Sequence, residues 1–214
     1  MGIDWSPDGE YLAIAGYQGV KIWHTQDWDD PDILDVPSAS LAVAWSPDGK
    51  YLAAANMDRT IAVLEWNNPH PWVMRGFPGK VRHLAWSNKM QQNTPLLAAS
   101  SVDGIVVWSK HVDDLKGWQG RVLAGHSGSV NALAEPAEGI AFQDHSFLLA
   151  SAADDSLCLW HKAKQLAQTL NGAVNGFSCL AWHPQGHQLA TGGKNGELLI
   201  WAKSLRGQGF TQRT

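Results

Sequence analysis

Three residues of the chain have the types that build a hydrolase triad: His126, Ser151 and Asp154. Catalysis of that kind needs a serine hydroxyl beside an imidazole base, and a carboxylate that orients the imidazole. A serine nucleophile often stands in a Gly-x-Ser-x-Gly turn, and the sequence around Ser151 does not contain one. Residue types alone predict a triad only loosely. We therefore expect a structural role for the three residues, no catalytic residue and no enzymatic activity.

Side chains that bind metal ions are also present, but their spacing is not that of a metal site. The chain has nine histidines, of which His183 and His187 flank one turn, and none of the strong zinc-binding spacings occurs. Residues 27–32 form an acidic segment without the spacing of an EF-hand loop, and a solvated turn is the favoured interpretation. The sequence therefore predicts no metal site and no cofactor.

Composition and the two cysteines limit the class of protein further. The 214 residues are 44% hydrophobic and 17% charged, which is sufficient for a buried core. The net charge of -4 disfavours duplex nucleic acid as a partner, because phosphate binding needs clustered positive charge. No apolar run reaches the roughly 18 residues that cross a membrane, so no membrane association is expected. Cys158 and Cys179 stand in strand-like apolar runs, and we expect two buried free thiols in a reducing cytoplasm, with a single disulfide as the alternative.

The elements that would position these side chains follow a repeat of about 40 residues with one longer interval. Each unit begins with a short apolar run around an aromatic residue, and these residues are Trp5, Trp45, Trp86, Phe142 and Trp182. A Leu-Ala pair follows in each unit, and a third apolar run closes on Trp23, Leu64, Trp108, Trp160 or Trp201. A weaker fourth run comes after it, for example at residues 33–36 and 72–74. Short alternating runs separated by turns such as Ser-Pro-Asp-Gly are typical of β-strands.

Four strands in each unit, together with these motifs, resemble the WD-repeat family over essentially the whole chain. The best match is the fourth unit, where Gly125-His126 stands for the family's Gly-His and Asp154 precedes Trp160 at the family's spacing. The resemblance implies an all-β propeller with five four-stranded units, at approximately residues 1–40, 41–80, 81–125, 126–176 and 177–214. It also implies a structural hydrogen-bonded tetrad of His126, Ser151, Asp154 and Trp160.

The other units depart from the family pattern. Leu64 stands at the tryptophan position of the second unit and Phe77 at the histidine position of the third, so only one complete tetrad is expected. The fourth unit is longer than the rest, and we interpret residues 135–139 as part of an insertion at the rim.

Five units leave two arrangements for the ring. The resemblance implies a ring of seven blades most often, so the chain is either a piece of such a ring or a smaller ring that closes by itself. We favour the partial ring. Its two end blades would each leave an apolar face uncovered, and uncovered faces of this kind favour self-association.

The family resemblance also implies a partner-binding face, formed by the loops before the first strands and the loops between the second and third strands. In this chain those loops carry the candidate residues Tyr17, Met57, Arg59, Arg75, Phe77, Lys80, Arg82 and Lys194, with Val102 beside them. The basic residues favour an acidic or phosphorylated peptide segment as the ligand. Four tryptophans lie outside the expected core runs and are candidate interface anchors, namely Trp28, Trp66, Trp72 and Trp118.

The sequence therefore predicts a non-catalytic scaffold that binds a protein or peptide partner on the loop face of a propeller. Two alternatives stay open. One is a metal-handling protein or a hydrolase that uses the mouth of the propeller channel, since fold does not decide function. The other is a sensor or regulatory domain of a larger signalling protein.

Overall fold

The computed structural model describes residues 2–17, 19–36, 38–66, 68, 70–102, 104–126, 139–144, 146–153, 156–204 and 209–213. Within these residues the chain forms five antiparallel sheets, each made of four strands that are consecutive in the sequence. The predicted all-β fold with five four-stranded units is therefore confirmed. The insertion expected at residues 135–139 lies almost wholly outside the described residues, which resume at 139.

The strands occur in chain order across every sheet. The first sheet contains β1 (Ile3–Trp5), β2 (Tyr11–Gly16), β3 (Gly19–His24) and β4 (Asp27–Leu34), and the second contains β5 (Ser40–Trp45), β6 (Tyr51–Asn56), β7 (Ile61–Glu65) and β8 (Trp72–Met74). The third contains β9 (His83–Gln91), β10 (Thr94–Ser101), β11 (Gly104–Lys110) and β12 (Trp118–Leu123). The fourth contains β13 (Gly139–Phe142), β14 (Leu149–Ala152), β15 (Leu157–His161) and β16 (Gln165–Leu170). The fifth contains β17 (Phe177–Trp182), β18 (Gln188–Gly193), β19 (Leu198–Lys203) and β20 (Phe210–Arg213).

The described chain has little helical structure. A single 3-10 turn, η1 (Asp114–Lys116), lies between β11 and β12, where Asp113 caps it by accepting the Leu115 backbone N–H. In the part of the chain that the structure describes, no helix has the length and apolar character needed to cross a membrane.

The turn between the first and second strands of a sheet is built by the Ser-Pro-Asp-Gly motif. The Ser6 hydroxyl donates to Asp8 Oδ1 at 2.5 Å and accepts the Tyr11 backbone N–H at 2.8 Å. Gly9 has a φ of 75°, a left-handed conformation that a side chain disfavours. Ser46 makes the same two kinds of bond in the second sheet. These turns fix the register of the first two strands.

Each sheet has two different faces, because successive side chains of a strand point to opposite sides. The aromatic face carries the first-strand aromatic residue and the second-strand leucine opposite it, such as Trp45 and Leu52. The alanine face carries the second-strand alanines and the aliphatic third-strand residues beside them, such as Ala53 and Val63. The aromatic face of each of the second to fifth sheets packs on the alanine face of the sheet before it. Four hydrophobic clusters fill these four interfaces.

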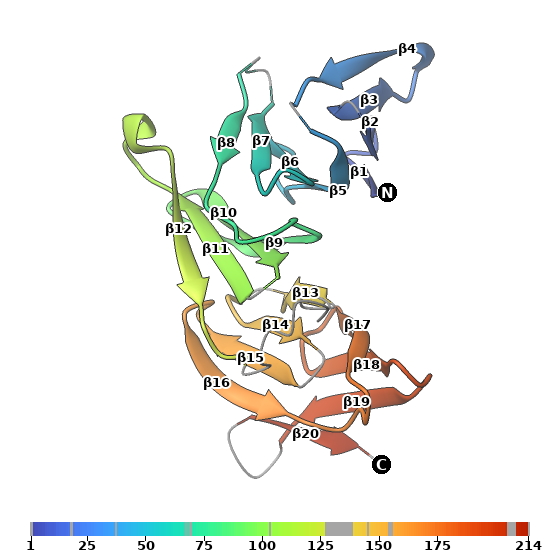
Figure 1. The fold of residues 1–214 in the computed structure, drawn as a ribbon, viewed down its shortest axis with the longest axis vertical. Coiled ribbons are helices and arrows are strands. Elements are labelled where there is room, and N and C mark those ends of the chain that lie inside the picture. The colour runs from blue at the N-terminus through green and yellow to red at the C-terminus, as the bar shows by residue number, and fades with distance from the viewer. Residues whose placement is uncertain are drawn as a thin grey trace.

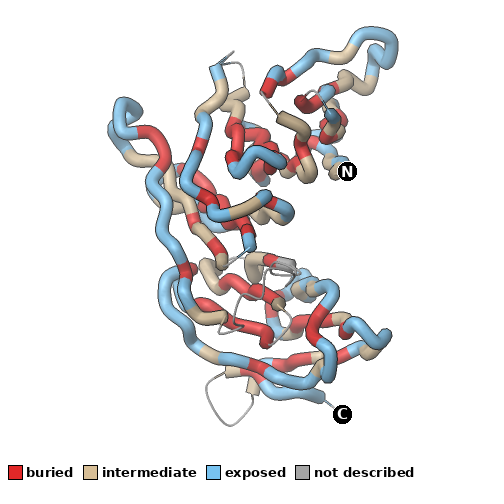
Figure 2. The backbone as a smooth tube through the Cα atoms, in the orientation of Figure 1, coloured by how far each residue is buried: buried red, intermediate tan, exposed pale blue. Residues whose placement is uncertain are grey.

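The five sheets follow one another along an open arc (Figure 1). The first strands of consecutive sheets contact one another and form its inner edge, whereas outer strands such as β12 and β16 are mostly exposed (Figure 2). The first and fifth sheets lie at opposite ends of the arc, with the N-terminus and the C-terminus beside them (Figure 1). This arrangement is an open, partial ring, as the repeat count and the family resemblance predict.

The structure corrects the expectation of a solvated turn at residues 27–32. These residues belong to strand β4, whose aspartates are exposed on the outer edge of the first sheet. Charged side chains are tolerated on an outer-edge strand because they do not have to be buried. The predicted fourth run at residues 33–36 overlaps only the end of β4, and the sequence pattern misses the first part of the strand because aspartate is rare in strands.

The two cysteines are both free thiols, but only Cys158 is buried. Cys158 lies in the hydrophobic cluster between the third and fourth sheets. Cys179 is exposed, contrary to expectation, because it lies in β17 of the fifth sheet, whose alanine face is not covered by any other part of the described chain. The alternation of apolar residues identifies the strand but does not show whether a neighbouring sheet covers it.

Candidate protein-binding surface

The loops before the first strands and the turns between the second and third strands lie at the same end of the strands in every sheet. We call the surface that they form the loop rim. Backbone hydrogen bonds join the two kinds of loop. The Met57 N–H donates to the Ala39 carbonyl at 3.0 Å at the second sheet. The Lys194 N–H donates to the Gly176 carbonyl at 3.0 Å at the fifth sheet. The fold therefore brings residues from separate parts of the sequence onto one surface.

Most of the predicted partner-binding residues are exposed on the loop rim. The exposed residues are Tyr17, Met57, Arg59, Arg75, Lys80, Arg82 and Lys194. Phe77 is different, because its side chain is only 5% exposed and its ring lies 6.0 Å from the Trp108 ring, measured between centroids. Phe77 belongs to the hydrophobic cluster between the second and third sheets, so its side chain is not available to a partner in this structure.

The exposed residues of the loop rim do not form a single patch. Tyr17 and Met57 lie at the turns of the first and second sheets. Four basic residues lie on the loops of the second and third sheets, namely Arg59, Arg75, Lys80 and Arg82. Lys194 lies in the turn between β18 and β19, at the other end of the arc (Figure 1). A short ligand on the first three sheets would therefore not reach Lys194.

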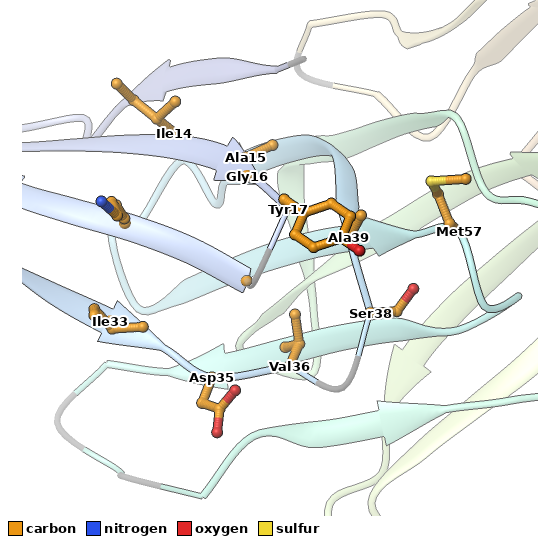
Figure 3. A pocket seen from close by; sticks show the side chains of 12 residues that line it. Ile14, Ala15, Gly16, Tyr17, Ile33, Asp35, Val36, Ser38, Ala39 and Met57 are labelled. Atoms are coloured by element: carbon orange, nitrogen blue, oxygen red, sulfur yellow. The ribbon is translucent and has the colours of Figure 1, made fainter.

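A groove of about 980 Å³ opens beside Tyr17 and Met57 (Figure 3). Its lining is mainly apolar and includes Ile14, Ile33, Val36 and Ala39, with Lys21, Asp35 and Ser38 as polar members. The Tyr17 side chain is 82% exposed at this groove, so its ring is accessible to a ligand. Sequence reasoning identified Tyr17 and Met57 but missed the isoleucines, because strand alternation assigns such residues to a core.

A buried polar network stiffens the turn that carries Met57 and the basic residue next to it. The Ser40 hydroxyl donates to Asn56 Oδ1 at 2.9 Å, and Asn56 Nδ2 donates to Thr60 Oγ1 at 3.0 Å. The Thr60 hydroxyl in turn donates to Asp58 Oδ1 at 2.6 Å. Arg59 lies between Asp58 and Thr60 with a φ of 67°. The carboxylate of Asp58 therefore offsets part of the positive charge of this turn.

The loop that carries Lys80 is held by hydrogen bonds from its backbone to a buried serine. The Ser101 hydroxyl donates to the Gly79 carbonyl at 2.9 Å and accepts the Gly79 backbone N–H at 3.2 Å. A further contact joins the same hydroxyl to the Lys80 carbonyl at 3.2 Å. The exposed lysine side chain thus projects from an anchored backbone, which limits the entropy that a ligand must remove on binding.

Three members of the predicted tetrad are hydrogen-bonded in the fourth sheet. The Ser151 hydroxyl lies 2.8 Å from His126 Nε2, and it accepts the indole N–H of Trp160 at 2.8 Å. Ser151 and Trp160 are both buried. The fourth member, Asp154, lies outside the described residues. The Ser151 hydroxyl is therefore buried and already bonded to an indole N–H, whereas a catalytic serine must be accessible to its substrate. We keep the interpretation that these residues have a structural role.

Equivalent positions in other sheets support this interpretation. In the fifth sheet the Trp201 indole N–H donates to Thr191 Oγ1 at 3.1 Å. In the third sheet Ala99 stands at the position of Ser151, and the buried Trp108 indole nitrogen has no hydrogen-bond partner. The tryptophan therefore keeps its place in a sheet with or without the hydroxyl.

The remaining candidate groups fall at separate places. Across the described ranges, no group of three or more His, Cys, Asp or Glu side chains is gathered closely enough to hold a metal ion. Among the four tryptophans proposed as interface anchors, Trp28 is exposed on β4, Trp66 and Trp72 are half-buried, and Trp118 is buried. Trp5, expected in the core, is half-exposed and contacts Trp28 edge-to-face at 6.4 Å between ring centroids.

Comparison with known proteins places these features in a family. The family model described as "WD domain, G-beta repeat" matches residues 36–64, 117–161 and 164–202. The chain is 32% identical over 117 residues to the anaphase-promoting complex subunit cdh1 of Dictyostelium discoideum, which covers 52% of this chain and 14% of that protein. It is 27% identical over 192 residues to the human WD repeat and HMG-box DNA-binding protein 1, which covers 85% of this chain and 16% of that protein.

A solved structure shows the same fold. A chain in the crystal structure of the mitotic checkpoint complex superposes with a TM-score of 0.74 at 22% sequence identity, covering 94% of this chain and 61% of that one. The present chain thus spans only a small part of the length of its curated relatives and about three fifths of the solved chain. The repeat pattern, the five four-stranded sheets and these matches agree, and the chain belongs to the WD40 repeat family.

Proposed function

We propose that the protein is a non-catalytic cytoplasmic scaffold that binds a protein or peptide partner on the loop rim of its first three sheets. The observation that carries this proposal is the groove of about 980 Å³ beside Tyr17 and Met57, with exposed basic residues on the adjacent loops. Two of the similar proteins are named as parts of multiprotein assemblies, the anaphase-promoting complex and the mitotic checkpoint complex. A role in protein binding agrees with those names.

The ligand that best fits this surface is an extended peptide with one apolar side chain and several acidic groups. The apolar side chain would enter the groove beside Tyr17, where burial of apolar area is favourable. Acidic or phosphorylated groups would lie over the basic loops, because arginine binds carboxylate and phosphate with paired hydrogen bonds. The exposed basic residues on these loops are Arg59, Arg75, Lys80 and Arg82.

Fluorescence anisotropy with synthetic peptides tests the proposal. The probes are a labelled peptide with a leucine or phenylalanine flanked by glutamates, its phosphoserine version, and a version with lysine in place of glutamate. We expect the acidic probes to bind, the lysine probe to bind much more weakly, and affinity to fall with salt concentration. Equal binding of all three probes, or binding of none, would overturn the proposal.

Matched charge variants locate the site. The variant Arg59→Glu with Lys80→Glu should reduce the affinity for the acidic probes by at least tenfold. The control variant, Lys50→Glu with Lys164→Glu, changes charge equally in hairpins on the opposite edge of the sheets and should retain affinity. If the two double variants lost affinity to the same extent, overall charge rather than the loop rim would explain the binding.

Self-association through the two uncovered end faces of the arc is a separate proposal. It needs no ligand at the loop rim, and it uses the alanine face of the fifth sheet together with the aromatic face of the first sheet, which shares Ile14, Lys21 and Ile33 with the groove.

A further inference from the structure

The aromatic face of the first sheet carries apolar side chains like those of the buried faces, yet several of these side chains are exposed. Ile3 and Trp5 of β1 are 61% and 50% exposed, whereas Val43 and Trp45 at the same positions of β5 are 7% and 6% exposed. The second sheet buries its residues against the alanine face of the first sheet. The described chain provides no sheet that could cover Ile3 and Trp5 in the same way (Figure 1).

The exposed part of this face reaches from the first to the fourth strand of the sheet, although Leu12, opposite Trp5, is buried. Ile3 lies opposite Ile14, Ile14 opposite Lys21, and Lys21 opposite Ile33, so the four residues form one row across β1, β2, β3 and β4. Ile33, at the outer end of this row, is exposed. A row of three isoleucines with one lysine is an apolar patch of the kind that marks an interaction site.

The alanine face of the fifth sheet is uncovered in the corresponding way. Leu198 of β19 is 74% exposed, although the equivalent third-strand residues of the other four sheets are all fully buried. Those equivalents are Val20, Ile61, Ile105 and Leu157. Cys179 and Ala181, on the first strand of the fifth sheet, are exposed on the same face as Leu198. The fifth sheet thus exposes an alanine face, and an alanine face is what the exposed aromatic face of the first sheet lacks as a neighbour.

The interfaces inside the chain show how two such faces fit. The Trp86 indole N–H of the third sheet donates to the Ala44 carbonyl of the second sheet at 2.9 Å. The Trp182 indole N–H of the fifth sheet donates to the Ala141 carbonyl of the fourth sheet at 3.0 Å. Each acceptor is the residue before the first-strand aromatic residue of its sheet. Trp5 is the equivalent donor of the first sheet, and the residue equivalent to the two acceptors in the fifth sheet is Ala181.

We propose that the aromatic face of the first sheet binds the alanine face of the fifth sheet of a second copy of this chain. In this contact the isoleucines of the first sheet cover Leu198, and the Trp5 indole N–H donates to the Ala181 carbonyl of the second copy. The apolar packing repeats an interface that the chain already forms four times between its own sheets. The indole hydrogen bond is present at two of these four, because the buried Trp45 indole nitrogen has no partner and the fourth sheet has Phe142 at this position. Because the two surfaces of the proposed contact differ, it is a head-to-tail contact that continues from copy to copy unless its rotation closes a ring.

Light scattering coupled to size exclusion, over a wide range of protein concentration, tests this contact. We expect the mean mass of the full chain to rise with concentration. Two variants each remove one of the two surfaces: Ile3→Glu on the aromatic face and Leu198→Glu on the alanine face. Both residues are exposed in the single chain, so neither substitution should unfold it. We expect each variant alone to be monomeric.

A mixture of the two variants gives the decisive result. The Ile3→Glu chain retains its alanine face and the Leu198→Glu chain retains its aromatic face, so together they should form a one-to-one dimer that cannot grow further. Recovery of this dimer also shows that both variants are folded. A wild-type chain that stays monomeric at every concentration, or folded variants that do not pair when mixed, would overturn the proposal.

Two further measurements separate this contact from other associations. Leu115→Glu changes an apolar residue in η1 that is even more exposed and far from both faces, and this variant should associate like the wild type. The exposed thiol of Cys179 should react with a maleimide more slowly as the protein associates, because the second copy covers that face. Both readouts are made without a peptide, so either proposal can fail while the other holds. Because Ile14 and Ile33 belong to both the groove and this face, a peptide and a second copy would compete for the first sheet.

Discussion

The first and second sheets carry the same kind of aromatic face, yet only that of the second sheet is buried. Trp45 is buried in the cluster between the two sheets, whereas Trp5, at the same position of the repeat, is half-exposed. The two residues have the same register with a leucine of the next strand. Burial in this fold is therefore a property of a pair of sheets and not of a position in the repeat.

The largest effect that tests this comparison is the loss of each tryptophan. Trp45→Ala should lower the free energy of unfolding by about 3–5 kcal/mol, because it leaves a cavity between two sheets. Trp5→Ala should lower it by only about 1 kcal/mol, since half of that side chain is already in water. Urea unfolding of the single chain at low concentration measures both values. Equal losses would show that the first sheet is covered in solution.

A smaller effect separates bonds within a sheet from packing between sheets. Ser151→Ala removes the acceptor of the buried Trp160 indole N–H and should cost about 1–3 kcal/mol of stability. The reverse change in the third sheet, Ala99→Ser, offers an acceptor to the unpartnered Trp108 indole and should add about 0.5–1.5 kcal/mol. Thermal unfolding monitored by circular dichroism compares the two. If Ala99→Ser destabilises the chain, the third sheet has no space for the hydroxyl.

The smallest effect concerns the charge at the interface between the first two sheets. Asp4 Oδ2 accepts the Trp45 backbone N–H at 2.8 Å. Burial raises the pKa of Asp4, and the backbone hydrogen bonds from Trp45 and Trp5 oppose this only in part. Because the pKa of Asp4 is higher in the folded state than in the unfolded state, protonated Asp4 favours folding. This contribution to the free energy of unfolding is fully present below the unfolded pKa and is lost as the pH rises through the folded pKa.

Asp4→Asn keeps an oxygen acceptor and removes the partly buried charge. It should stabilise the chain by a few tenths of a kcal/mol at neutral pH, and the difference from the wild type should vanish in acid, below about pH 4. Urea unfolding at several pH values measures this difference. A variant that is less stable than the wild type at neutral pH would mean that the charge itself strengthens the bond to Trp45.

The sequence alone was sufficient to predict the sheets, because each uses the same local signals. The first-strand aromatic residue, the Leu-Ala pair and the turn residues recur in every unit, and local periodicity determines which residues form strands. The pattern places the fourth strand of the first sheet at residues 33–36 and misses the earlier part of β4, where aspartates replace the usual apolar residues of an outer strand. Outer strands are poorly predicted in general because few of their side chains must be buried.

The candidate site was predicted less completely, since it depends on neighbours that a repeat pattern does not specify. The exposed basic residues follow from their place in the loops, but Phe77 turned out to be buried against Trp108. The groove walls Ile14 and Ile33 resemble core residues in the sequence and are accessible only because nothing in the described chain covers the first sheet. The sequence of a strand determines which side chains lie on a face of its sheet, but the neighbouring sheets determine whether that face is buried.

The construction of each sheet from four consecutive strands has a consequence for how the chain folds. All strand pairs join neighbours in the sequence, so each sheet closes only short loops and can form early and quickly. During synthesis the first of the five sheets is completed before the second, and its alanine face becomes the surface on which the second sheet packs. Every intermediate of this series ends in the same kind of surface, so a ribosome-bound chain exposes one uncovered alanine face at its growing end at every stage.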